Sequence, residues 1–244
     1  MDDKNSFIEC FRGAAPYIHA HTRKIFVLQM GGDVVASDSF SHLIHDLALL
    51  NSLAIKLVIV FGVRPQIDKI LKEKNIIPEY CGPLRVTDEA SINSVTQAVG
   101  DVKIKIEALL SMGLPNSPMA DSAIKVASGN YVTGRPYGIL NGVDMNLTGR
   151  VRSIEKETIN NRLEAGEIVL ITPLGYSTTG EVFNLSSIEI ATQISIELAA
   201  DKLIMFNNSR ILKGDNGETI RQITCAEAKT KLDSNSKKYI DETS

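Results

Sequence analysis

Short apolar runs alternate with amphipathic segments along most of the chain. The clearest run, residues 25–28, is followed by the glycine pair Gly31-Gly32 and then by polar residues. A second segment, residues 56–61, is apolar after Lys56 and ends in the same way at Gly62. Between the two runs, apolar residues recur every three or four positions, as expected for a helix with one buried face. The pattern predicts two parallel strands whose glycine turns lie at the same edge of one sheet.

The same alternation continues to about residue 206. Pro65 is well placed in the first turn of a helix, and residues 78–87 predict a short hairpin that leads to Thr87 or Asp88 as the N-cap of a long helix. Glycine turns divide residues 122–152, which favours a β-hairpin lid over a parallel strand. The remaining expected elements are a helix at 154–163, a strand at 167–172, a turn and short strand at 178–183, a helix at 186–198 and a strand at 201–206.

The chain divides into three parts in this pattern. Residues 1–22 form an N-terminal helix arm, in which Pro16 predicts a kink or a new first turn. The arm can serve oligomerisation or pack on its own domain, and both interpretations are open. Residues 23–229 form the sheet domain, and residues 230–244 are a polar tail without periodicity.

Composition indicates a soluble globular protein. With 244 residues, of which 43% are hydrophobic and 23% charged, the chain can bury a full core. The net charge of -3 argues against non-specific binding to nucleic acid or to anionic membranes. The sequence has no apolar run of membrane-spanning length, and its acidic start lacks a signal-peptide pattern. A cytoplasmic location is therefore expected.

Cysteine and histidine spacing does not indicate a metal site. The three cysteines have no CxxC spacing, so reduced thiols are expected rather than disulfides or zinc ligands. His42 and His45 have helical spacing but no acidic ligand pattern nearby.

A series of motifs is similar, in its order, to one protein family. The motifs are FRGAAPYIHAH, FVLQMGG, LVIVFGVRPQID, LRVTD, LLSMGLPNSPM, SGNYVTGRP, GEIVLITPLGYSTTGEVFNLSSIEIATQ and ADKLI. From about Ser6 to about Glu227 the chain resembles the amino-acid-kinase-like N-terminal domain of bacterial N-acetylglutamate synthases. SMGLPN with GVRPQID favours the synthases over the related acetylglutamate kinases. The resemblance implies an α/β/α sandwich, three layers around a mainly parallel sheet.

The resemblance also implies a place in the first step of arginine biosynthesis. In this family the kinase-like domain senses L-arginine, and a C-terminal acetyltransferase domain transfers the acetyl group of acetyl-CoA to glutamate. The sequence has no acetyl-CoA pyrophosphate loop and ends before the family's last kinase-like elements. We therefore expect no acetyl transfer and no cofactor in this chain unless a separate acetyltransferase subunit is present. We also expect the uncovered sheet edge to favour association over a stable monomer.

The charges that phosphoryl transfer needs are missing from the expected positions. Kinases of this superfamily place a lysine two positions before the glycine pair, where this chain has Gln29. Their organising acidic residue aligns with Ile188, next to Glu189, and Val63 adds a Cβ that hinders close approach of a phosphate. We expect no catalytic residue in this chain.

The remaining candidate residues fall into two groups. A vestigial ligand pocket is expected from Gln29, Gly31, Gly32, Gly62, Arg64, Arg85 and Asn184. Each of them also has a structural interpretation, as a turn, an ion pair or an internal hydrogen bond. The resemblance implies that Tyr17, in the PYI motif, and Lys202, in ADKLI, contact arginine.

Three functions remain open, besides a truncated remnant without function. The chain can be a regulatory module that binds L-arginine and self-associates through residues 6–20. It can be one subunit of a split enzyme, in which a partner carries the acetyl-CoA site. It can be a residual kinase that uses ATP and N-acetylglutamate, which Gln29 and Ile188 argue against.

Overall fold

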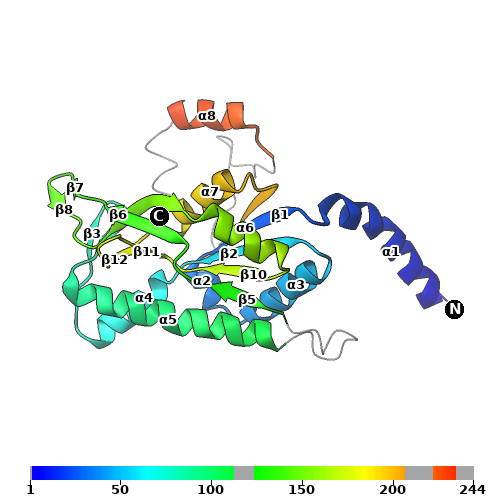
Figure 1. Ribbon diagram of the computed structural model, residues 1–244, viewed down its shortest axis with the longest axis horizontal. Coiled ribbons are helices and arrows are strands. Elements are labelled where there is room, and N and C mark those ends of the chain that lie inside the picture. The colour runs from blue at the N-terminus through cyan, green and yellow to red at the C-terminus, as the bar shows by residue number, and fades with distance from the viewer. Residues whose placement is uncertain (1, 113–123, 207–221, 235–244) are drawn as a thin grey trace.

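The computed structural model describes residues 2–112, 124–206 and 222–234 (Figure 1). Helices and strands alternate along most of the chain. In order they are α1 (Asp2–His21), β1 (Ile25–Met30), α2 (Gly32–Val35), α3 (Phe40–Ser52), β2 (Lys56–Phe61), α4 (Arg64–Glu73), β3 (Glu79–Cys81), β4 (Leu84–Val86), α5 (Glu89–Ser111), β5 (Val126–Ser128), β6 (Val132–Pro136), β7 (Ile139–Leu140), β8 (Val143–Asp144), β9 (Gly149–Ile154), α6 (Lys156–Glu164), β10 (Ile168–Ile171), β11 (Leu174–Tyr176), β12 (Val182–Asn184), α7 (Ser187–Glu197), β13 (Lys202–Phe206) and α8 (Cys225–Ser234).

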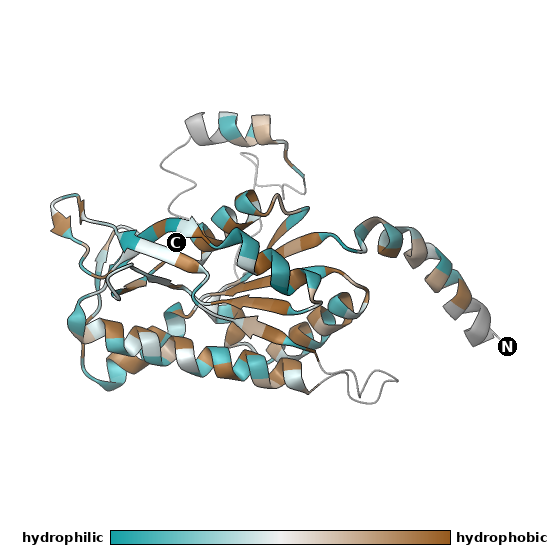
Figure 2. Ribbon diagram, in the orientation of Figure 1, coloured by the Kyte–Doolittle hydropathy of each residue, from teal (hydrophilic) through white to brown (hydrophobic). Residues whose placement is uncertain are grey.

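A five-stranded parallel sheet forms the middle layer, in the order β13-β1-β2-β10-β5. Its central strands are mostly apolar, as Figure 2 shows, because both faces of the sheet are covered. Alternate residues of β1 point to opposite faces, so Leu28 joins one core with α3, α4 and α5, while Val27 joins the other with α6 and α7. The predicted α/β/α sandwich around a mainly parallel sheet is confirmed.

A second sheet, β12-β11-β6-β9, lies next to the main sheet. The β6–β9 pair is antiparallel, and β7–β8 is a small hairpin, as the glycine turns in residues 122–152 predict. The prediction is wrong for β5, which pairs in parallel with β10 in the main sheet. Its three residues are too few to show the apolar pattern that marked β1 and β2. Strand β11 was not predicted, and it pairs with both β6 and β12.

Helix α1 extends away from the sheet domain (Figure 1). It continues through Pro16 as one helix, although that residue predicted a kink or a new start. Because much of α1 is exposed, water can reach the carbonyl that Pro16 leaves without a donor. Ile8, Phe11 and Tyr17 are 44%, 59% and 71% exposed, so the alternative of a helix packed on its own domain does not describe α1. Near the other end, the predicted boundary between domain and tail falls within α8.

Candidate functional site

The glycine turns of β1 and β2 meet at the carboxyl edge of the main sheet. Helix α4 begins directly after the second turn, and α7 begins nearby, where the Ser186 side chain caps it. Strand ends and helix N-termini of this kind attract anions in open α/β sheets. Here Gln29, which is 5% exposed, donates a hydrogen bond from Nε2 to the Ser187 hydroxyl at 3.1 Å. The side chain at the position of the kinase lysine is therefore bonded within the protein.

The glycines at this edge let the two turns pack against each other. A Cβ on Gly32 would lie 2.6 Å from Cδ of Pro65 and 3.0 Å from the Arg64 backbone nitrogen. Gln66 donates from Nε2 to the Gly32 carbonyl oxygen at 2.8 Å. A Cβ on Gly62 would lie 3.1 Å from Oγ of Ser187. Close protein packing alone therefore accounts for glycine at Gly32, which supports the structural interpretation.

Residues 188 and 189, at the position of the acidic residue in the kinases, present no unbonded carboxylate to this edge. Ile188 is apolar and 44% exposed. Glu189 lies beside it, but its Oε1 accepts a hydrogen bond from the Val151 backbone nitrogen at 3.2 Å. Val63, predicted to hinder phosphate approach, is itself buried in the main core.

A buried polar network joins the end of β4 to the second sheet, close to Arg85 and Asn184. Thr148 Oγ1 lies 2.5 Å from the Arg85 carbonyl oxygen and accepts a hydrogen bond from the Thr87 backbone nitrogen at 3.0 Å. Asn184 donates from Nδ2 to Thr87 Oγ1 at 3.0 Å. Thr87 is 0% exposed and Thr148 is 4% exposed, and neither was predicted as a site residue. Nothing in the local sequence marks them, because the network depends on segments 61 to 97 residues apart.

The side chains of Arg64 and Arg85 gather around Tyr80. Both guanidinium carbons lie over the tyrosine ring, at 5.2 and 4.9 Å from its centroid. Arg85 is 7% exposed and forms an ion pair with Asp68, which also accepts a hydrogen bond from the Tyr80 hydroxyl at 3.2 Å. Nη1 of Arg85 is buried and makes no hydrogen bond within the described residues. Nη2 pairs with Asp68, and Nη1 keeps its capacity to donate a hydrogen bond.

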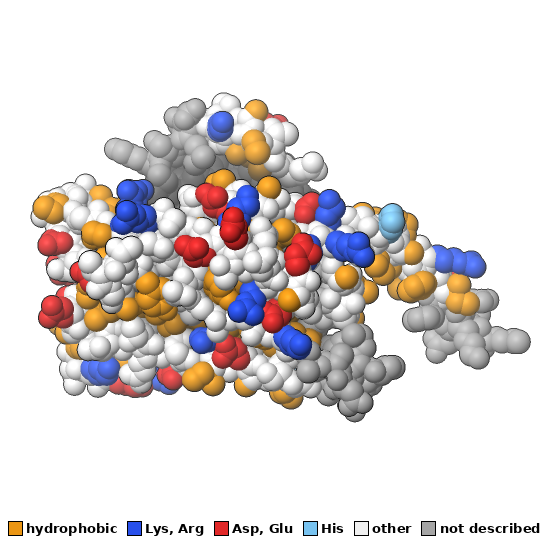
Figure 3. Space-filling view, viewed as in Figure 1, with side chains coloured by type: hydrophobic (Ala, Val, Ile, Leu, Met, Phe, Trp, Pro, Cys, Tyr) orange, Lys and Arg blue, Asp and Glu red, His pale blue; other side chains and the backbone are white. Residues whose placement is uncertain are grey.

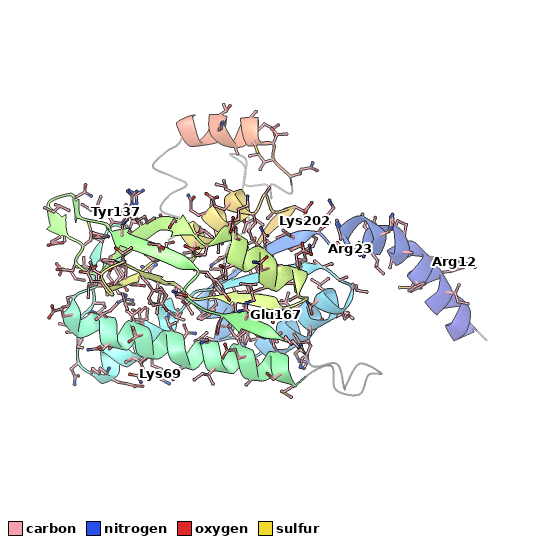
Figure 4. All side chains as sticks on the ribbon, in the orientation of Figure 1. Arg12, Arg23, Lys69, Tyr137, Glu167 and Lys202 are labelled. Carbon is pink, nitrogen blue, oxygen red and sulfur yellow. The ribbon has the colours of Figure 1, made fainter. Side chains whose placement is uncertain are left out.

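Tyr17 and Lys202 lie at the opposite edge of the sheet from the glycine turns. Lys202 begins β13 and pairs in register with Phe26 at the amino end of β1. Its Nζ lies 3.2 Å from Nε2 of His21 and 5.3 Å from the Phe26 ring centroid. Tyr17 lies one helical turn before His21 (Figure 4 labels Lys202 at this junction). The structure therefore joins Lys202 to the end of α1 and adds His21, which the sequence did not mark.

Two aspartates have a lowered pKa, and the carboxylate of each accepts a hydrogen bond from a backbone nitrogen. The Asp88 side chain accepts a hydrogen bond from the Ser91 backbone nitrogen at 2.8 Å, and its bonds to Ser91 lower its pKa. Asp201 accepts from the Ile25 backbone nitrogen at 2.9 Å, which is the main cause of its lowered pKa, and pairs with Lys24 at 3.1 Å. The first caps α5 and the second ties β13 to β1.

The described part of the chain offers neither a cluster of metal ligands nor a membrane-spanning helix. Its histidine, cysteine, aspartate and glutamate side chains form no group of three or more that is arranged to hold a metal ion. Its helices include none with the length and apolar character needed to cross a membrane.

Known proteins match both the sequence and the fold. The amino acid kinase family matches residues 24–242. An amino-acid acetyltransferase from Pseudomonas syringae pv. syringae is 46% identical over 217 residues, covering 89% of this chain and 50% of that protein. The structure of N-acetylglutamate synthase from Neisseria gonorrhoeae with coenzyme A and L-arginine aligns with a TM-score of 0.85 at 30% identity, covering 97% of this chain and 55% of that one.

These matches confirm the resemblance that the motifs indicate. The chain spans about half the length of these relatives. A carbamate kinase from Giardia aligns with a TM-score of 0.56 at 12% identity, over 86% of this chain and 82% of that one. That likeness shows the shared fold alone.

Proposed function

The chain belongs to the amino acid kinase family, and we propose that it acts in arginine biosynthesis as the regulatory, L-arginine-binding module of an N-acetylglutamate synthase. The similarity to amino-acid acetyltransferases supports this assignment, as does the relative solved with L-arginine. In this proposal the chain contributes regulation, and an acetyltransferase partner transfers the acetyl group of acetyl-CoA to glutamate. The cytoplasm is the compartment that this role requires.

The observation that carries the proposal is the junction between α1 and β13. Lys202 is exposed, and its ammonium group suits the carboxylate of an amino acid. Tyr17 offers a ring that is 71% exposed, and guanidinium groups stack on such rings. His21 lies within 3.2 Å of Lys202 and can share the carboxylate. The three side chains bring together the chemistry that free arginine needs.

Phosphoryl transfer is not part of the proposed function. Gln29 supplies no charge and is bonded to Ser187, while Glu189 is bonded to the backbone of β9. We expect no consumption of ATP when N-acetylglutamate is added. The Gln29→Lys variant should also be inactive, since Ile188 leaves no acidic group at the second position. Turnover by that variant would contradict the argument.

Self-association through α1 is the second part of the proposal. Ile8 and Phe11 are 44% and 59% exposed on a helix that extends from the domain, and exposed apolar side chains of this kind mark protein interfaces. Light scattering coupled to chromatography should give a mass above 26.6 kDa for the chain. The Phe11→Asp variant should shift the equilibrium toward the monomer. A single sharp monomer peak for the unaltered chain would contradict this part.

A thermal-melt series tests the arginine site directly. A ligand that binds only the folded state stabilises it by about 2.7 kcal/mol at roughly 100 times its Kd. We expect a dose-dependent rise in Tm with L-arginine and none with ATP, N-acetylglutamate or acetyl-CoA. L-citrulline, which lacks the charged guanidinium, should give a smaller rise.

Variants locate the site in the same series. Tyr17→Ala and Lys202→Ala should each reduce the shift produced by L-arginine at a fixed concentration. Lys69→Ala is the matched control, because Lys69 is an exposed lysine on α4, away from Lys202 (Figure 4). If the rise in Tm with L-arginine were unchanged in the Tyr17 and Lys202 variants, the arginine site would not lie at this junction. If the unaltered chain showed no rise in Tm, arginine binding would be rejected.

A further inference from the structure

Three arginines lie together on the β6–β9 strand pair. Arg135 of β6 is directly opposite Arg150 of β9, and Arg152 is two residues further along β9. All three are exposed, and none forms an ion pair with any residue that the structure describes. Figure 3 shows a group of basic side chains over this part of the molecule.

The arginines occupy the outer face of the pair. A Cβ on Gly149 would lie 2.7 Å from Cβ of Phe183, so Gly149 faces the buried side of the sheet. Gly134 faces the same side, with Gly175 backbone atoms 3.1 Å from its Cβ position. Side chains alternate along a strand, so Arg135 and Arg150 point away from the core.

This arrangement does not serve stability. Like charges directly opposite each other in an antiparallel pair are destabilising, because their Cβ atoms are only about 4.5–5.5 Å apart. A carboxylate opposite Arg135 would stabilise the pair instead. The chain has more acidic than basic residues, 29 against 26, so the arginine group is not a consequence of overall charge. The nearby Glu189 carboxylate bonds to the Val151 backbone nitrogen and forms no ion pair with these arginines among the described residues.

Two neighbouring side chains give the face the composition of a protein interface. The Arg150 guanidinium lies 5.1 Å from the centroid of the Tyr137 ring, which keeps it extended over an aromatic surface. Ile139, at the start of the β7–β8 hairpin, is 76% exposed. Arginine and tyrosine are enriched among the residues that contribute most of the binding energy at protein interfaces.

We propose that Arg135, Arg150 and Arg152, with Tyr137 beside Arg150 and the exposed Ile139 at the start of the following hairpin, form a docking face for an acidic surface of a partner protein. Among the described residues, the three arginines are exposed along two adjacent strands, so one partner surface can contact all three guanidinium groups. The partner's carboxylates remove the repulsion between Arg135 and Arg150. Small-molecule ligands prefer concave sites, which favours a protein surface here. The inference is independent of the arginine site at α1 and β13.

The binding test uses the full chain and a fluorescently labelled poly-L-glutamate peptide at low ionic strength. Anisotropy should show binding that weakens at least tenfold in the Arg135→Glu/Arg150→Glu variant. Lys69→Glu/Lys72→Glu is the matched control, since both lysines are exposed on α4 and the charge change is equal. This control should bind within twofold of the unaltered chain. Equal weakening in both variants would overturn the proposal in favour of non-specific attraction.

Two further measurements distinguish an acidic partner protein from a small phosphate ligand and from a second copy of this chain. Competition by inorganic tripolyphosphate at the same concentration of charge as poly-L-glutamate would overturn the proposal in favour of a small phosphate ligand. Loss of self-association in the Arg135→Glu/Arg150→Glu variant, measured by light scattering, would overturn it in favour of a second copy of this chain.

The single variant Arg150→Glu gives the sharpest result, because binding and stability should move in opposite directions. It places a carboxylate opposite Arg135, so Tm should rise while poly-L-glutamate binding weakens. A lower Tm would show that Arg150 serves the fold through Tyr137 and would overturn the proposal.

Discussion

The two edges of the parallel sheet use their polar side chains differently. At the carboxyl edge, Gln29 bonds to Ser187 and the turn glycines pack against neighbouring chain. At the amino edge, Tyr17 is largely exposed, and the Lys202 ammonium group lies near His21 and over the Phe26 ring. Residues that in kinases of this fold would hold a ligand are thus absorbed into the structure at one edge. At the other edge, side chains stay available to a ligand or partner.

The largest expected effect comes from the apolar support of the carboxyl edge. Phe61, the last residue of β2, is fully buried, so Phe61→Ala should cost about 3–5 kcal/mol in the free energy of unfolding. Phe11→Ala, on the exposed arm, should change it by less than about 0.5 kcal/mol. Urea denaturation at one low protein concentration measures both. Similar losses would mean that the arm packs on the domain.

The next effect concerns the buried polar network. Thr148→Val keeps the shape of the side chain but removes the hydroxyl that bonds to Arg85 and Thr87, and should cost about 1–3 kcal/mol. Thr96→Val, at an exposed position of α5, is the control and should be nearly neutral. If the Thr148 variant were equally neutral in urea denaturation, the network would not contribute to the free energy of unfolding.

A smaller, pH-dependent effect is expected at the N-cap of α5. Asp88→Ala should cost about 1 kcal/mol at pH 7, because the carboxylate caps the Ser91 backbone nitrogen. The pKa of Asp88 is lowered in the folded state, so this stabilisation is present above the ordinary aspartate pKa and is lost as the pH falls through the folded value. The difference between the two proteins should therefore shrink in acid. For Asp38→Ala, at an exposed position before α3, little difference is expected at any pH.

The smallest effect is expected at the amino edge itself. Asp201 ties β13 to β1 through the Ile25 backbone nitrogen, and its pKa is lowered mainly by that bond. Asp201→Asn should speed amide hydrogen exchange in β13 while exchange in β2 stays unchanged, because edge strands open locally. A global change in exchange would show that this edge is as firmly integrated as the other.

Much of the fold could be predicted from the sequence because its central strands are buried on both faces. The apolar runs of β1 and β2 lead to glycine turns, with Gln29 as the one polar residue between the β1 run and its turn, so the strand positions follow from pattern alone. Strands β5 and β11 have only three residues each and no such run. Helix α1 continues through Pro16 because the helix is exposed to solvent, and the periodicity of apolar residues does not show that exposure.

The candidate site was less accessible to sequence reasoning, because its contacts are distant in sequence. Gln29 and Ser187 are 158 residues apart, and His21 and Lys202 are 181 apart. The motifs marked one member of each pair and missed its partner. Arg85 was marked, but its unbonded Nη1 results from packing around Tyr80 that the sequence does not encode locally.

The pairing of β1 with β13 also has a consequence for biosynthesis. Ile25 and Asp201, which join these strands, are 176 residues apart, so β1 leaves the ribosome long before its neighbour exists. At translation rates of about 5–20 residues per second, this interval lasts roughly 9–35 s. During that time one side of β1 has no strand beside it, and its apolar residues are open to pairing with other nascent chains. Chaperones that bind nascent chains are therefore expected to reduce association of β1 with other chains during this interval.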